Sequence, residues 1–398
     1  MQENRTLLND IIQRNYIKYF QAGNQKQFSL VLNHGAICCT NCAIDANYSD
    51  DDINVGINNF DTNLDICLDW YINNKCKCNI NIIGKDDIEL YNKTLDKILE
   101  KCGKGQSALT AVHLCTNGEF LNGDKIDNYI KLFTESNIQL LFTIYVKDKI
   151  IVKDNILPCI EKVITYITPD NINEWGERYQ WWLTEAQPDL YDKLTILETN
   201  KGWTPQTIEQ FQIFYNYYLF VNSKLLYSDN LTNYIINHEL SNNGWTENTD
   251  YIPCDLQKQL CIYVPNNRLL VCPGLTDELM SIGYLTNNGD FDEENVALNV
   301  IKDHIKIGTL PRCEICPCVG TCRTGCWAES FQSHGNILVA CPEYCTLQKT
   351  KMAILLKFII DNQLWSQIEN DANISIYYRE YLRMQIKKIA GVEDENNG

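Results

Sequence analysis

The chain has 398 residues, 45% of them hydrophobic and 11% aromatic, which is enough for two to three domains with a substantial core. Its 34 Lys and Arg against 51 Asp and Glu give a net charge of −17, which repels nucleic acid and anionic membranes and attracts basic peptides. Because no basic segment followed by an apolar one marks the chain for export, we expect its 19 cysteines to be reduced and cytoplasmic. The best candidate for a membrane span, 352–361, is interrupted by Lys357 and Asp361, so we expect an amphipathic helix there and no membrane span.

Up to about residue 235 the sequence alternates between apolar runs and amphipathic stretches. After a helical pattern over 1–27, strands are predicted at 28–32, 78–83, 111–115, 140–146, 163–167 and 194–197. Helices are predicted at 59–72, 88–100, 125–135, 172–183 and 205–220. This order predicts an α/β domain over 28–235 with six parallel strands, as a full or partial barrel or as an open sheet. Either arrangement places the chemistry at the carboxyl ends of the strands.

The alternation stops near residue 236, and the segment 236–349 is rich in Cys, Pro, Gly and Asn. Its cysteines include a dense group at Cys313, Cys316, Cys318, Cys322, Cys326, Cys341 and Cys345. Such a density is typical of metal ligation, but a CxxC pair suits zinc as well as an iron–sulfur cluster, so spacing alone does not choose the metal. We expect a small second domain that folds around its metal, followed over 350–398 by C-terminal helices and an acidic tail.

The order of these cysteines resembles the SPASM extension of radical S-adenosylmethionine (radical SAM) enzymes, whose core signature is CxxCx5CxxxC. Four cysteines fit that signature, namely Cys313, Cys316, Cys322 and Cys326. Three more stand upstream in the family's order, namely Cys254, Cys261 and Cys272. The resemblance implies two auxiliary 4Fe-4S clusters. One would be held by Cys254, Cys261, Cys272 and Cys326.

The second auxiliary cluster would be held by Cys313, Cys316 and Cys322 together with either Cys341 or Cys345. Cys318 would then be left over, and a surplus thiol is usually a buried non-ligand. The alternative reading of the same cysteines is a domain stapled by zinc, because paired cysteines also make structural zinc sites.

The loop after the first predicted strand lies where the radical SAM family places CxxxCxxC, the ligands of its first cluster. Here the loop holds Cys38, Cys39 and Cys42. With Cys39 and Cys42 as the CxxC pair, Gly35 takes the first ligand position, and with Cys38 and Cys42 as the CxxxC pair, Asp45 takes the third. Neither register gives three thiols, although an Asp oxygen can replace a sulfur as a poorer ligand.

Residues at four further predicted strand ends resemble the family's S-adenosylmethionine contacts. Gly84 and Asp86 stand where the family has Gly-Gly-Glu, and the turn Thr116-Asn117-Gly118 matches its Thr-Asn-Gly-x-x-Leu turn. Thr143 and Asn171 follow at the next two strand ends, with Thr143 in place of the family's Ser. The resemblance implies a partial (β/α)6 radical SAM-like barrel followed by a Cys-rich SPASM-like domain and C-terminal helices.

The implied activity is that of an oxidoreductase that modifies a peptide or protein side chain through a 5′-deoxyadenosyl radical. Its cofactors would be S-adenosylmethionine, two auxiliary 4Fe-4S clusters and a third that binds S-adenosylmethionine. Its partners would be a peptide or protein substrate, attracted if basic, and an external electron donor. The sequence names no substrate base. The alternative is a non-catalytic, metal-stapled binding protein with a degenerate radical SAM barrel, which the Gly35 and Asp45 positions favour.

Overall fold

The computed structural model describes residues 27–33, 59–84, 87–103, 105, 107–147, 149–199, 202–226, 231–232, 235–236, 259–270, 272–274, 281–293, 316, 318, 322, 328, 330, 334–335, 341–370 and 376–389. The described residues form two compact units. The first contains those within 27–166, 182–197 and 259–293. The second contains those within 167–181, 198–236 and 316–389.

A sheet of ten strands makes the frame of the first unit, in the order β10-β9-β8-β7-β1-β2-β3-β4-β5-β6. The first six strands are β1 (Gln27–Val31), β2 (Asn79–Ile83), β3 (Ala111–Thr116), β4 (Gln139–Val146), β5 (Ile160–Ile167) and β6 (Leu194–Glu198). The pairs from β1–β2 to β4–β5 are parallel. These strands lie within a few residues of the predicted ones, because strands covered on both faces read as nearly continuous apolar runs.

Four strands from the Cys-rich part of the chain extend the same sheet. They are β7 (Gln259–Tyr263), β8 (Arg268–Leu270), β9 (Ser281–Leu285) and β10 (Phe291–Glu293). β7 pairs in parallel with β1, and β8, β9 and β10 follow as antiparallel neighbours. The described strands therefore form one open row and no closed barrel. The limits proposed for the second domain, 236–349, remain a prediction.

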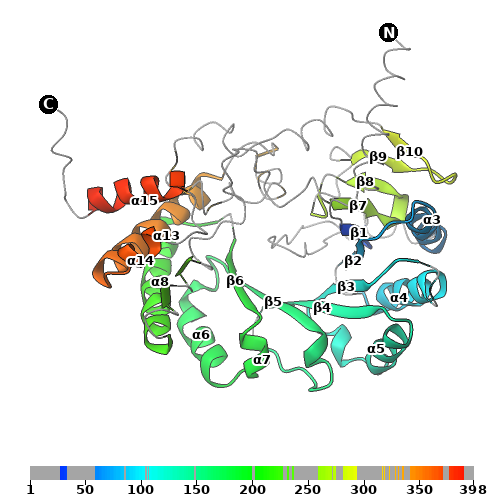
Figure 1. Cartoon of the computed structure of the whole chain (residues 1–398), viewed down its shortest axis with the longest axis horizontal. Coiled ribbons are helices and arrows are strands. Elements are labelled where there is room, and N and C mark those ends of the chain that lie inside the picture. The colour runs from blue at the N-terminus through cyan, green and yellow to red at the C-terminus, as the bar shows by residue number, and fades with distance from the viewer. Residues whose placement is uncertain are drawn as a thin grey trace, which may run out of the picture. The chain divides into compact units, whose positions relative to one another are not determined.

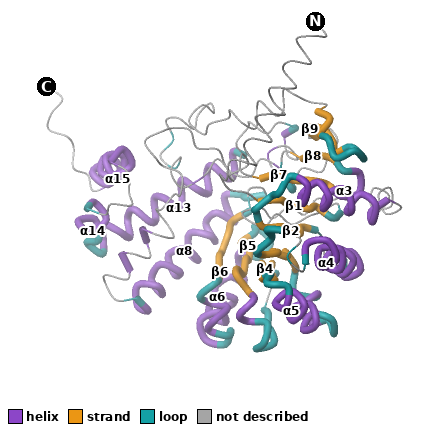
Figure 2. The backbone as a smooth tube through the Cα atoms, turned by 45° about the vertical axis from the view of Figure 1, so that its right-hand side comes forward, coloured by secondary structure: helices purple, strands orange, loops and turns teal. Residues whose placement is uncertain are grey.

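Helices cover the outer face of this sheet (Figures 1 and 2). They are α3 (Phe60–Asn73), α4 (Ile88–Cys102) and α5 (Ile126–Glu135). α3 buries Phe60, Leu64, Cys67, Leu68 and Tyr71, the stripe expected of an amphipathic helix. α4 begins where the Asp87 carboxylate accepts a hydrogen bond from the Leu90 amide at 3.0 Å.

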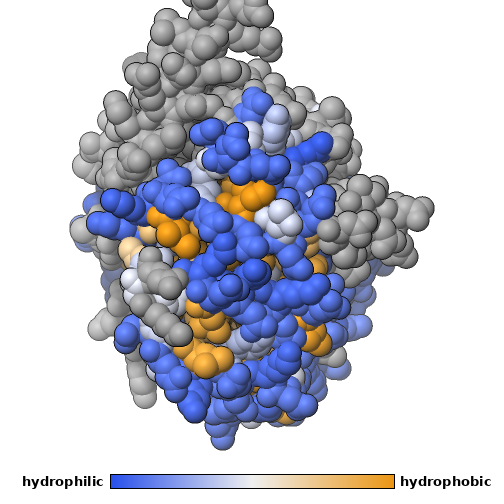
Figure 3. Space-filling view, turned by 90° about the vertical axis from the view of Figure 1, so that its right-hand side faces the viewer, coloured by the Kyte–Doolittle hydropathy of each residue, from blue (hydrophilic) through white to orange (hydrophobic). Residues whose placement is uncertain are grey.

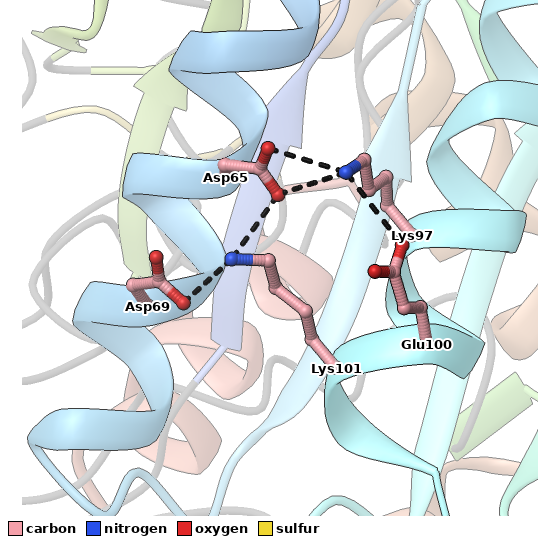
Figure 4. Close-up of polar contacts among 5 residues, drawn as sticks. All are labelled: Asp65, Asp69, Lys97, Glu100 and Lys101. Atoms are coloured by element: carbon pink, nitrogen blue, oxygen red, sulfur yellow. Dashed lines mark hydrogen bonds and ion pairs between the residues drawn. The ribbon is translucent and has the colours of Figure 1, made fainter.

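Ion pairs join α3 to α4 on the side away from the sheet (Figure 4). Lys101 Nζ lies 2.6 Å from Asp69 Oδ1 and 3.1 Å from Asp65 Oδ1, and Lys97 Nζ lies 3.2 Å from the same Asp65 atom. Burial alone would raise the pKa of Asp65, but the hydrogen bonds from Lys101 and Lys97 outweigh it and lower that pKa. The surrounding face is mostly hydrophilic, with separate hydrophobic patches (Figure 3).

The second unit is helical. Its described helices are α6 (Trp175–Thr184, up to residue 181), α8 (Pro205–Leu225), α13 (Pro342–Asp361), α14 (Trp365–Glu369) and α15 (Ile376–Ile389). α7 (Pro188–Tyr191) belongs to the first unit. Thr204 and Thr207 form a reciprocal capping box at the start of α8. The last helical region begins at Pro342 rather than at the predicted residue 350, and it breaks into three helices.

Candidate functional site

The carboxyl ends of the parallel strands meet at one edge of the first unit, and buried residues of these strands and of β8 pack together on the sheet. This buried cluster consists of Val31, Ile83, Cys115, Tyr145, Ile164, Cys261, Tyr263 and Leu270. The rings of Tyr145 and Tyr166 stack over it, with centroids 6.2 Å apart and planes 2° from parallel. The cluster gives the edge an apolar floor from which water is excluded.

Gly84 ends β2 at this edge, where the backbone comes close to the end of β1. A Cβ atom at Gly84 would lie 3.1 Å from Asn33 Oδ1 and 3.4 Å from Leu32 Cβ, so a side chain there would crowd the neighbouring strand end. The buried Tyr91 hydroxyl lies 3.1 Å from the Gly84 carbonyl oxygen and 2.8 Å from that of Cys115. One tyrosine of α4 therefore fixes the ends of β2 and β3. Asp86 lies outside the described residues.

Thr116, Asn117 and Gly118 form a tight turn at the end of β3. Thr116 Oγ1 accepts a hydrogen bond from the Gly118 amide at 3.0 Å, and Asn117 Oδ1 accepts one from the Glu119 amide at 2.8 Å. Gly118 has a φ of +99°, which a residue with a Cβ atom adopts only at a cost. Thr116 is buried and Asn117 is exposed, so the turn presents the Asn117 side chain outward.

The other two predicted contacts, Thr143 and Asn171, do not lie in the turns that directly follow β2 and β3. Thr143 is buried within β4, in register with Cys115, one inward-facing position before Tyr145. Asn171 lies in the second unit, where its Oδ1 accepts hydrogen bonds from the Thr168 amide at 2.8 Å and from Trp175 Nε1 at 2.9 Å. The Asn171 oxygen therefore already holds the turn between β5 and α6. A role for either residue in cofactor binding remains a prediction.

The described part of the chain contains six of the thirteen predicted metal ligands. The first-cluster candidates Cys38, Cys39, Cys42 and Asp45 lie outside it, as do Cys254, Cys313 and Cys326. In the first unit Cys261 is fully buried on β7, and Cys272 is buried with its Sγ 3.3 Å from the Gly274 amide nitrogen. The remaining four, Cys316, Cys322, Cys341 and Cys345, belong to the second unit.

The described thiols of the second unit fall into two groups, one at Cys316, Cys318 and Cys322 and one at Cys341 and Cys345, at the start of α13. Cys318, which has no predicted role, lies beside the predicted ligands Cys316 and Cys322. Its pKa is raised by a hydrogen bond with Cys316, by burial and by the nearby Cys322 thiol. The Cys322 amide also donates to the Cys318 carbonyl at 2.7 Å. Cys341 is the N-cap residue of α13, and Cys345 lies one turn further on. Burial, and then a hydrogen bond to Glu343, raise the pKa of Cys341 to about 11.

The donor chemistry of the second unit fits an iron–sulfur cluster. Five described thiols in one unit are the ligand type that such clusters require, whereas hard ions prefer oxygen. No three His, Cys, Asp or Glu side chains among the described residues are placed to hold a single metal ion. Both proposed ligand sets also include cysteines outside the described residues, so the sets themselves remain predictions.

Two polar pairs that each include a strand residue were not predicted from the sequence. His113 Nδ1 on β3 lies 2.7 Å from Glu161 Oε2 on β5, and its Nε2 lies 3.2 Å from Asn79 Nδ2 on β2. In the second unit, Lys351 Nζ of α13 lies 2.7 Å from the largely buried Glu198, the last residue of β6. The sequence signal for the first pair is the imidazole of His113 inside the predicted strand 111–115, and for the second it is Glu198 directly after the predicted strand 194–197.

Comparison with known proteins identifies the fold. No protein family matches the sequence, and no curated protein matches it. Among solved structures, native anSMEcpe with bound AdoMet (S-adenosylmethionine) aligns with a TM-score of 0.51 and 13% identity, over 85% of this chain and 100% of that one. A hexahistidine-tagged form of anSMEcpe with bound AdoMet aligns with a TM-score of 0.50 and 12% identity, over 84% and 98%. The chain has the radical SAM fold.

This likeness confirms the predicted α/β fold class with its mostly parallel sheet. The SPASM-like character of the Cys-rich segment remains a prediction. Gly84 follows β2 and Asn117 follows β3, so both lie at the carboxyl ends of neighbouring parallel strands, and Thr116 is the last residue of β3. Their role in cofactor binding remains a prediction. None of the described helices is long and apolar enough to cross a membrane.

Proposed function

We propose that this chain is a radical SAM enzyme that modifies a peptide or protein side chain. The observation that carries the proposal is the Thr116-Asn117-Gly118 turn, held by its own side chains at the carboxyl edge of a radical SAM fold. Support also comes from anSMEcpe, which shares this fold over its full length and whose structures hold S-adenosylmethionine.

Within this proposal, the edge residues bind S-adenosylmethionine and keep water from the reaction. Gly84 lets the ends of β1 and β2 lie close together at the site. Asn117, directly after β3, and Thr143, on the neighbouring β4, supply hydrogen bonds to the cofactor. The apolar floor under Tyr145 and Tyr166 shields the site from water. When bound, S-adenosylmethionine and its 4Fe-4S cluster supply a 5′-deoxyadenosyl radical that abstracts a hydrogen atom from the substrate.

The remaining parts of the proposal concern partners and compartment. Cys261, Cys272 and the second-unit thiols would hold two auxiliary 4Fe-4S clusters that pass electrons to and from an external donor. The net charge of −17 would attract a basic peptide or protein segment. Thiols that bind such clusters must stay reduced, which is why we place the protein in the cytoplasm.

The decisive experiment measures cofactor cleavage. Anaerobically reconstituted protein, reduced with dithionite, is expected to convert S-adenosylmethionine to 5′-deoxyadenosine above controls that lack reductant, and Cys42→Ala is expected to abolish the conversion. We expect slow turnover without substrate, since a radical enzyme gains by withholding the reaction until its target is bound. Assays should therefore run for hours.

A second candidate is a non-catalytic binding protein that keeps the fold and the auxiliary metal. It is favoured by Gly35 and Asp45, which leave either register of the first-cluster motif one thiol short. Calorimetry separates the two candidates. If S-adenosylmethionine neither binds nor yields 5′-deoxyadenosine while iron is present, the binding protein is the correct description.

A further inference from the structure

Helix α13 runs beside α8 in the second unit (Figures 1 and 2). One side of α13 is buried, and its residues change from polar to apolar along the helix. Cys341, Cys345 and Gln348 recur at spacings of four and three residues, so they share one side of the helix. Further along, the same side is apolar and buried, with Met352, Leu355, Leu356 and Ile359. Gln348 therefore lies between the two cysteines and the apolar residues on this side of the helix.

The Gln348 side-chain amide is buried, and no described neighbour accepts a hydrogen bond from it. Its side chain is in a residue only 6% exposed to solvent, and its Nε2 has no hydrogen-bond partner among the described residues. A buried amide that donates no hydrogen bond costs free energy, and native proteins rarely leave one so. An acceptor that protein atoms do not supply would remove this cost.

The acceptor lies toward the start of α13, because side chains on a helix lean toward its N-terminus. One turn in that direction lies Cys345, and two turns away lies Cys341. The Gln348 amide is therefore directed toward the thiols of Cys345 and Cys341. An iron–sulfur cluster bound by such thiols would place further sulfur atoms there.

We propose that Gln348 Nε2 donates a hydrogen bond to a sulfur of the auxiliary cluster at the start of α13, and so raises that cluster's reduction potential. The inference rests on the proposed function, because it requires the cluster to be present. Hydrogen bonds to cluster sulfurs stabilise the extra negative charge of the reduced state, which makes the cluster easier to reduce. Gln348 would be a positioning and tuning residue rather than a ligand.

The test compares reduction potentials in the full chain. Anaerobically reconstituted wild type, Gln348→Leu, Gln348→Glu and the control Gln212→Leu are assayed for iron and sulfide and titrated with EPR detection. Gln212 is an exposed amide on α8 of the same unit, so its loss should shift nothing. We expect Gln348→Leu to keep its iron and to shift the potential of one cluster to a more negative value. Gln348→Glu, which brings a negative charge to the same place, should shift it further.

A second measurement covers the case in which the variants fail to fold. Wild type labelled with ¹⁵N in the glutamine side chains is reduced, and pulsed EPR is used to detect ¹⁵N coupled to a cluster. Coupling supports the inference, and its absence overturns it, as does an unchanged potential in iron-replete Gln348→Leu. Wild type that binds zinc or no metal would overturn the inference together with the cluster assignment. Full clusters with no glutamine effect would overturn the inference alone.

Discussion

At the scale of single residues, the turn after β3 offers the sharpest test of cofactor binding. Gly118 and Gly105 both have positive φ angles, +99° and +76°, so Ala at either position should cost about 1–2 kcal/mol of stability. Only Gly118 lies in the proposed site. We expect Gly118→Ala to raise the Kd for S-adenosylmethionine about tenfold, or about 1.4 kcal/mol, and Gly105→Ala to leave it unchanged. Calorimetry and urea unfolding of both variants decide this, and equal Kd values would count against the site.

Asp65 gives a prediction about pH. Its folded pKa lies below the ordinary value of 3.8, so its ion pairs stabilise the fold above that value and lose their effect as the pH falls through the folded pKa. About a third of the Asp65 side chain is exposed, so we expect Asp65→Asn to cost no more than about 1 kcal/mol at pH 7. The difference from wild type should shrink steadily below pH 4, as measured by urea unfolding.

The control for Asp65 is Glu89→Gln, which removes the more exposed pair between Glu89 and Lys93. It should change the free energy of unfolding by much less at every pH. A pH-independent loss in Asp65→Asn would mean that the carboxylate acts through packing rather than through its charge.

At the scale of elements, the sequence predicted the six parallel strands because their apolar runs have the length and spacing of buried strands. It did not predict β7, β8, β9 and β10, and of these β8 (Arg268–Leu270) and β10 (Phe291–Glu293) are too short to show a period. The start of α13 was misplaced, although Pro342 directly after Cys341 is the pattern of a first helical residue after its cap.

The candidate site was predicted only in part, because some of its residues are placed by contacts between distant segments. Gly84 and Thr116 follow strand ends and could be placed from strand order alone. Gln348 and the pair Glu198–Lys351 depend on which helix face turns inward and on contacts between distant segments, which one sequence does not record. Cys318 was not predicted to be a ligand because it falls outside the CxxCx5CxxxC motif, yet it lies beside the predicted ligand Cys316.

Helix α8 carries a testable prediction of its own. Thr204 Oγ1 accepts the Thr207 amide at 3.2 Å, and Thr207 Oγ1 accepts the Thr204 amide at 2.9 Å. We expect Thr204→Ala to lower the free energy of unfolding by about 1 kcal/mol. Thr346→Ala is the matched control, because Thr346 bonds back to the Pro342 carbonyl within α13, where Ala is at least as favourable. Equal losses in the two variants would contradict the cap.

At the scale of the whole molecule, metal and folding should be coupled in the second unit. Replacing Cys316 and Cys322 together with Ala is expected to remove about four iron atoms per chain and to lower the melting temperature. Cys159→Ala is the control, because Cys159 lies between β4 and β5 in the first unit and belongs to no proposed ligand set. Iron and melting temperature that stay at the wild-type level in the double variant would refute the assignment.

The pairing of β1 with β7 has a consequence for synthesis on the ribosome. β1 is among the first described segments to be made, but its second neighbour in the sheet lies beyond residue 258. Until that neighbour emerges, one side of β1 offers unpaired backbone groups that another nascent chain could bind. Contacts between such distant segments also form slowly. Production of the protein should therefore benefit from slow translation or low temperature, which give the late strand time to reach β1 before other chains do.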